Sequence, residues 1–227
     1  MRFGAIRKFG VAPALAGMAV LTAAAFGAFQ FTTGAGADQR NEMYTADLQA
    51  LNPDVGPGAV DGQAKIFVQG DTIRVHLNAR NVEPGIMHAM HIHAADRCPD
   101  ASDDANNDGV VDVIEGLPKY GPILVPLDSD LSSQAAGTFP TASNGGTLHY
   151  HQSADLNAML DDLHAVDPNT GDAVIKLQPG EALNLAGRHI VVHGVALSTP
   201  LPATTASLGT APPQATLPVA CGEITAK

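Results

Sequence analysis

Turn-forming residues divide this chain into short apolar segments, and this feature limits its fold more than any other. Its 227 residues include 23 Gly and 16 Pro, spread along the sequence. Helical bundles and coiled coils need long uninterrupted stretches of helix-forming residues, so these folds are excluded. Hydrophobic residues still make up 45 % of the chain. That content is enough for a buried core and excludes wholesale disorder.

The segments between the turns have the pattern of short strands. Residues 72–79 alternate apolar and polar side chains, and Gly70-Asp71 before them is typical of a hairpin turn. We expect one helix at residues 153–163, with Ser153 as its N-cap, and a loop at residues 198–218. Short strands with frequent turns predict an all-β antiparallel sandwich or barrel. The other expected strands are residues 43–51, 64–69, 87–94, 120–127, 147–151, 173–177 and 189–195.

Residues 1–37 have the layout of a secretory signal peptide. Three cations lie within the first eight residues, residues 11–29 are uncharged and apolar, and Ala35-Gly36-Ala37 is a cleavage sequence. An uncleaved anchor remains an alternative, since the apolar run is nearly long enough to span a bilayer. We therefore expect a periplasmic or secreted protein with one domain at residues 38–227.

The charge balance limits the class of partner. The chain has 23 acidic and 12 basic residues, a net charge of −11. Nucleic acid is not an expected partner, because its binding needs clustered cations. We expect no membrane contact beyond the possible N-terminal anchor, while a second copy of the chain or another envelope protein remains an open partner.

The chain has two cysteines, Cys98 and Cys221. In the oxidising compartment that the leader predicts, they are most simply explained as a disulfide. Two free buried thiols are the alternative.

Residues 104–115 match the twelve-residue calcium loop of EF-hands. Asp and Asn oxygens lie at positions 1, 3 and 5, a Gly lies at the sharp turn, and a Glu ends the loop. The expected ligands are Asp104, Asn106, Asp108, the Val110 carbonyl, Asp112 and Glu115. Proline on both sides indicates a solitary loop without EF-hand helices, inserted at residues 99–118. We expect calcium to have a structural role here, and a solvated acidic loop is the alternative.

Six of the nine histidines lie in pairs of matching strand parity. The pairs are His91 with His93, His149 with His151, and His189 with His193. Residues two apart on a strand face the same side, and imidazoles gathered on one face suit copper or zinc. A hydrogen-bonded polar network is the alternative.

Three segments resemble the copper/zinc superoxide dismutases, in the form found in bacteria. They are residues 85–98, with His88, His91, His93 and Cys98; residues 187–193, ending at His193; and residues 220–224, around Cys221. The resemblance implies an eight-stranded Greek-key β-barrel or flattened sandwich. It also implies that His91, His93 and His193 bind copper and that His88 is a structural histidine.

The chain departs from that family at two functional positions. Ile123 stands where the family has the histidine that bridges copper and zinc, and Pro218 stands where it has an arginine that attracts superoxide. No histidine lies between His93 and His149, so we do not expect a zinc site. His149, His151 or His189 is the candidate for a fourth copper ligand.

These features predict an exported, superoxide dismutase-like protein with copper at a three-histidine site, calcium in its loop, and weak or no dismutase activity. A copper-only superoxide dismutase is one alternative. A metal-free structural barrel of the cell envelope, stabilised by calcium, is the other.

Overall fold

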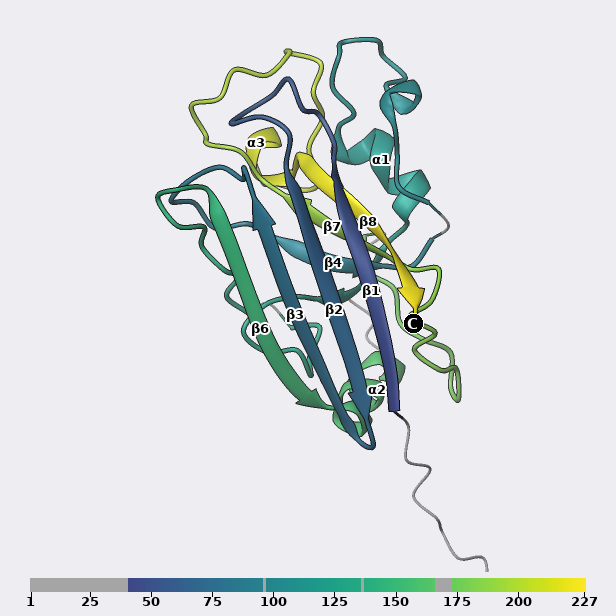
Figure 1. The fold of residues 1–227 in the computed structure, drawn as a ribbon. Coiled ribbons are helices and arrows are strands. Elements are labelled where there is room, and N and C mark those ends of the chain that lie inside the picture. The colour runs from purple at the N-terminus through teal and green to yellow at the C-terminus, as the bar shows by residue number, and fades with distance from the viewer. Residues whose placement is uncertain (1–40, 96, 136, 166–172) are drawn as a thin grey trace, which may run out of the picture. The chain divides into compact units, whose positions relative to one another are not determined.

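The computed structural model describes residues 41–227, apart from residues 96, 136 and 166–172 (Figure 1). The predicted signal peptide at residues 1–37 lies outside the described residues. Within the described part, no helix is both long enough and apolar enough to cross a membrane.

Eight antiparallel strands form one curled sheet, a half-barrel. The hydrogen-bonded order is β5-β4-β7-β8-β1-β2-β3-β6, so β5 and β6 end the sheet. The all-β class is therefore confirmed. The strands are β1 (Asn41–Ala50), β2 (Asp61–Gln69), β3 (Thr72–Arg80), β4 (Met90–His93), β5 (Ile123–Pro126), β6 (Thr147–Asp155), β7 (His189–His193) and β8 (Pro218–Ala226).

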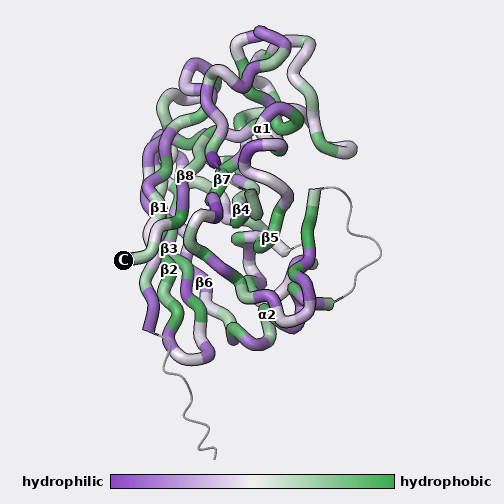
Figure 2. The backbone as a smooth tube through the Cα atoms, turned by 90° about the vertical axis from the view of Figure 1, so that its right-hand side faces the viewer, coloured by the Kyte–Doolittle hydropathy of each residue, from purple (hydrophilic) through white to green (hydrophobic). Residues whose placement is uncertain are grey.

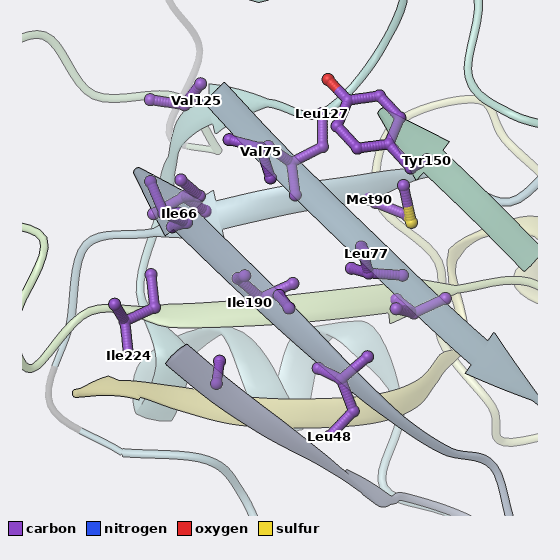
Figure 3. Packing of buried hydrophobic residues seen from close by; sticks show 14 of the residues in the cluster. Leu48, Ile66, Val75, Leu77, Met90, Val125, Leu127, Tyr150, Ile190 and Ile224 are labelled. Atoms are coloured by element: carbon purple, nitrogen blue, oxygen red, sulfur yellow. The ribbon is translucent and has the colours of Figure 1, made fainter. Parts of the chain in front are cut away.

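The curl places the strands in two layers with the core between them. Seen from the side in Figure 2, β1, β2 and β3 lie on one side of this region and β4 and β5 on the other. Strand β3 shows the expected alternation, since Ile73, Val75, Leu77 and Ala79 are buried. Figure 3 shows Val75 and Leu77 facing the same interior as side chains of β2, β4 and β7, such as Ile66, Met90 and Ile190.

The prediction of a single short helix was wrong. The structure has α1 (Val113–Tyr120), α2 (Leu156–His164), α3 (Pro213–Thr216) and a short 3-10 helix at Ala101–Asp103. Helix α1 begins inside the predicted calcium loop because Asp112 caps it, accepting hydrogen bonds from the backbone N–H groups of Ile114 and Glu115. Proline therefore did not exclude a helix beside the loop, since Pro118 lies within α1.

Two further local predictions were wrong, one at the start of a helix and one for a whole strand. Strand β6 stays paired with β3 up to Asp155, so Asp155 rather than Ser153 caps α2. Residues 173–177 form no strand, and Val174 makes only an isolated bridge to Ile123. The alternation rule gave no signal for β8. Residues Pro218–Gly222 are buried without a break, because β8 pairs with both β1 and β7.

Candidate metal centre

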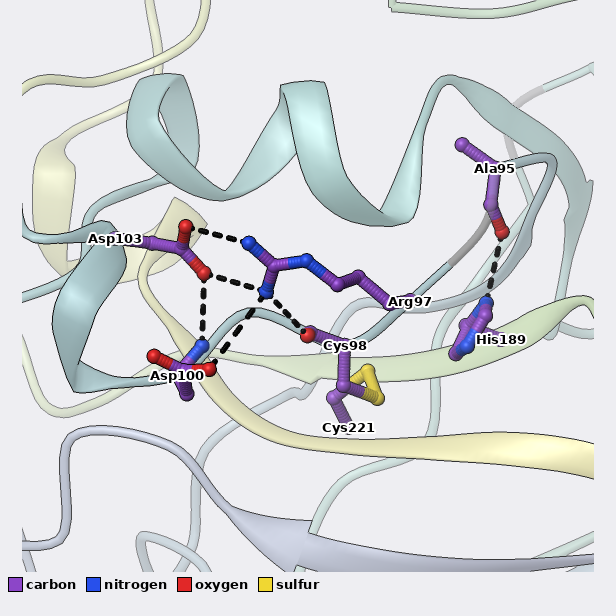
Figure 4. The surroundings of a disulfide bond; sticks show 7 residues. All are labelled: Ala95, Arg97, Cys98, Asp100, Asp103, His189 and Cys221. Carbon is purple, nitrogen blue, oxygen red and sulfur yellow. Dashed lines mark hydrogen bonds and ion pairs between the residues drawn. A yellow bond between two sulfur atoms is a disulfide. The ribbon is translucent and has the colours of Figure 1, made fainter.

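The cysteines form the predicted disulfide, which anchors the segment after β4. Cys98 and Cys221 are bonded, with their Cα atoms 5.7 Å apart (Figure 4). Beside it, the Arg97 guanidinium donates two 2.7 Å hydrogen bonds to the Asp103 carboxylate and one to the Cys98 carbonyl. The guanidinium holds the pKa of Asp103 well below its usual range. A disulfide indicates an oxidising compartment, such as the periplasm or the cell exterior.

His91, His93 and His193 lie together on the face of β4 and β7 that points away from the main core. Met90 and Ile92 on β4 face that core, so strand alternation turns His91 and His93 to the opposite side. The strand register shifts next to His93 and again next to His193. Such bulges re-aim side chains locally.

The three imidazoles converge with unpaired nitrogens. One ligand atom from each ring lies within 4.8 Å of those from the other two. Nδ1 of His91 and Nε2 of His93 and His193 are buried and have no hydrogen-bond partner. Buried polar atoms normally have partners. Three orphaned nitrogens around one point are therefore the arrangement expected of a metal site.

Backbone carbonyls fix two of the rings. Nδ1 of His93 donates to the Gly121 carbonyl at 2.7 Å, and Nδ1 of His193 donates to the Thr216 carbonyl at 2.8 Å. Each bond sets the tautomer that leaves a lone pair on Nε2, as is usual for metal-binding histidines. Gly121 is required where it lies, because its φ is 79° and a Cβ there would come within 2.5 Å of the Ala95 Cβ.

Burial keeps these histidines neutral. It is the main cause that lowers the pKa of His93 to about 3 and that of His193 to about 4. The pKa of His91 also lies well below its usual value, through burial and through its two histidine neighbours. Neutral imidazole is the form that binds metals, so the site is ready for one even in mildly acidic solution.

A pocket of about 160 Å³ opens onto the three histidines. Its lining contains no Asp, Glu, Lys or Arg in the described part of the chain. The Tyr120 ring lies edge-on to His93, with centroids 4.6 Å apart, and Phe139 contacts His91 at 5.2 Å. Sequence reasoning missed both aromatic residues, because no motif marks them. The main apolar walls are Val113, Leu117, Tyr120, Ile123, Leu208 and Ala215.

The other candidate ligands lie outside this group. His149 and His151 are on the exposed face of β6, and four strands separate β6 from β7 in the sheet order. His149 is hydrogen-bonded to Asn78, and His151 stacks on His76 with ring centroids 3.9 Å apart.

Two further histidines lie near the group and are held by backbone carbonyls. His189 is opposite His93 in the β4–β7 pairing, and its Nδ1 donates to the Ala95 carbonyl (Figure 4). His88 is fully buried, with ring nitrogens 3.0 Å from the His193 carbonyl oxygen and 2.9 Å from that of Glu83.

The side chains of three predicted calcium ligands accept hydrogen bonds from backbone N–H groups of their own loop. Asp104 accepts from the N–H groups of Asp108 and Gly109, and Asn106 also accepts from that of Asp108. Glu115 accepts from the N–H groups of residues 105, 106 and 112. Among the described residues, the histidine group is the one set of three or more His, Cys, Asp or Glu whose ligand atoms meet within 4.8 Å. Calcium binding therefore stays a prediction.

The predicted calcium loop contacts the covering segment, residues 204–216, whose later part lines the pocket. The Thr204 hydroxyl donates to Asp108 at 2.6 Å, and the Ala206 N–H donates to Asp112 at 2.6 Å. Residues after this point, Leu208 and Ala215, line the pocket opposite α1. The predicted calcium site and the histidine site are thus joined through one wall.

Neither protein-family models nor curated protein sequences match this chain. The resemblance to copper/zinc superoxide dismutases therefore rests on its motifs and stays a prediction.

Proposed function

We propose that this protein is an exported copper protein with a superoxide dismutase-like fold and with weak or no dismutase activity. Nδ1 of His91 and Nε2 of His93 and His193 would hold the metal. Two observations carry the proposal: the three histidines bring ligand nitrogens within 4.8 Å of one another, and each has a buried nitrogen without a partner.

Copper suits this donor set. Imidazole is a ligand for copper, zinc, iron and nickel, and the motif resemblance favours copper among them. Bound copper would supply one-electron redox chemistry. The chain itself orients two of the rings through the Gly121 and Thr216 carbonyls and surrounds the site with apolar side chains.

The surroundings support poor capture of superoxide, which is an anion. Ile123, at the place of the family's bridging histidine, lines the pocket as an apolar side chain. Pro218, at the place of the arginine, is buried in β8 and paired with His193. The net charge is −11, and no cation is among the described lining residues, so no side chain of the pocket draws an anion toward the metal.

A copper-only superoxide dismutase is the second candidate. It would convert two superoxide ions and two protons into oxygen and hydrogen peroxide. The pocket favours this candidate in one respect, because it gives a small molecule access to the three histidines.

We further propose that calcium binds at residues 104–115 and orders α1 and the covering segment. The hydrogen bonds that the covering segment donates to the Asp108 and Asp112 carboxylates support this role. Removing calcium with a chelator should expose residues 100–118 to proteases, and unchanged proteolysis would count against it.

The decisive experiment measures copper in the exported protein, purified from cells supplied with copper. We expect one copper per chain in the wild type and none in His91→Ala or His193→Ala. His149→Ala is the matched control, since His149 is an exposed histidine outside the group, and it should keep its copper.

Superoxide turnover by the copper-loaded protein then separates the two copper proposals. A folded wild-type protein that holds calcium but no copper would overturn both and favour the metal-free structural barrel.

A further inference from the structure

We propose that the pocket in front of the three histidines binds a small uncharged molecule with an apolar body about the size of a benzene ring. The inference rests on the proposed function for one point only, namely that a lone-pair atom of this molecule reaches the bound metal.

The walls of the pocket are apolar on two sides. Val113, Leu117 and Tyr120 of α1 form one side, and Leu208 and Ala215 form the other. Apolar walls favour an apolar ligand, because binding removes the apolar surfaces of both from water.

The few polar wall groups have partners within the protein. The Tyr120 hydroxyl donates to the Val113 carbonyl, and the Thr216 hydroxyl donates to the Pro213 carbonyl, both at 3.4 Å. Among the described lining residues, the buried polar atoms without a partner are the histidine nitrogens. The pocket therefore suits a ligand that is polar at one atom and apolar elsewhere.

The volume sets the size of that ligand. A dry apolar cavity of about 150 Å³ takes up benzene, and this pocket measures about 160 Å³.

The charge of the lining residues decides whether the ligand can carry a charge. Moving an ion into apolar surroundings without a partner costs far more than moving a neutral group. Of the lining residues that the structure describes, none carries a charge that would offset this cost. In the metal-free protein, the pocket therefore selects for an uncharged ligand over an anion of similar size.

The first experiment uses the metal-free protein and benzene as the probe, so it does not depend on copper. Titration followed by amide chemical shifts should show saturable benzene binding, with shifts at α1 and at residues 208–216. Ala215→Phe, which fills the pocket from α3, should weaken this binding at least tenfold. Absence of benzene binding in the wild type would overturn the proposal.

The second experiment uses the metal-free protein with two probes of matching shape, neutral benzamide and anionic benzoate. Benzamide should bind at least tenfold more tightly than benzoate in the wild type. Leu117→Lys places a cation on the wall and should reverse this order. Ile114→Lys adds the same charge on the exposed side of α1, outside the pocket, and should not. Tighter binding of benzoate than of benzamide by the wild type would overturn the proposal.

The copper measurement and the benzene titration separate the proposals. Benzene binding without any copper binding would refute the copper function and leave the uncharged-ligand pocket standing. Copper binding without benzene binding would refute the uncharged-ligand pocket and leave the copper function standing.

Discussion

Asp112 is the residue whose replacement tests most directly how the predicted calcium loop supports the pocket. The residue is 2 % exposed. One oxygen accepts the N–H groups of Ile114 and Glu115 at 2.8 and 3.1 Å, which caps α1, and the other accepts the Ala206 N–H at 2.6 Å. Asp112→Ala removes all three hydrogen bonds.

The expected loss in the free energy of unfolding is the sum of two contributions. Loss of an N-cap costs about 1 kcal/mol, and a buried hydrogen bond to a charged group contributes about 1.5–3 kcal/mol. Asp112→Ala should therefore destabilise the protein by about 2.5–4 kcal/mol, which lowers Tm by roughly 5–15 °C for a domain of this size. Asp112→Asn keeps the cap but turns an amide donor toward Ala206, so it should lose mainly the second contribution.

The assay is denaturant unfolding in excess chelator, so that calcium binding does not contribute to the difference. Asp155→Ala is the matched control. Asp155 caps α2 with two 2.9 Å hydrogen bonds, is exposed, and makes no third bond of this kind to a distant segment. It should cost about 1 kcal/mol. An equal cost for Asp112→Ala and Asp155→Ala would refute the argument that Asp112 ties the covering segment to α1.

Three further predictions concern the backbone, the histidines and the disulfide. Gly121→Ala should weaken copper binding and lower Tm more than Gly180→Ala, because both glycines have positive φ but only a Cβ at Gly121 meets Ala95; equal effects in copper titration and thermal melts would contradict this. The metal-free protein should lose stability as pH falls from about 6.5, since the unfolded histidines bind protons while the buried ones do not, at up to about 1.4 kcal/mol per pH unit for each histidine. Unfolding curves of His193→Ala should show a shallower pH dependence than the wild type, and an unchanged slope would exclude this cause. Replacing Cys98 and Cys221, 123 residues apart, with alanine should cost about 5 kcal/mol in denaturant unfolding on the chain-entropy model, and a loss below 1 kcal/mol would show that the crosslink restrains little.

The local sequence predicted the strands that have one buried and one exposed face. Strand β3 and its hairpin with β2 follow directly from alternation and from the Gly70-Asp71 turn, because one face of each is buried and the other is not. Strand β8 escaped prediction because its burial depends on β1 and β7, which are distant in sequence. Helix α1 escaped for a different reason: its cap, Asp112 with Glu115, is local, but these residues match the calcium loop and Pro118 favours a helix break.

By itself, the sequence determined the all-β class, the disulfide partners and the shared face of His91 and His93, since strand parity and oxidising chemistry are local properties. Only the tertiary structure decided which histidines meet. Parity gave His149 and His151 the same standing as His193, but parity does not give the strand order. In the sheet, four strands separate β6 from β7, and His149 and His151 lie on the exposed face of β6. The contacts of Tyr120 and Phe139 with the histidines, and the apolar pocket in front of the three rings, likewise depend on α1 and the segment after β7 covering that face.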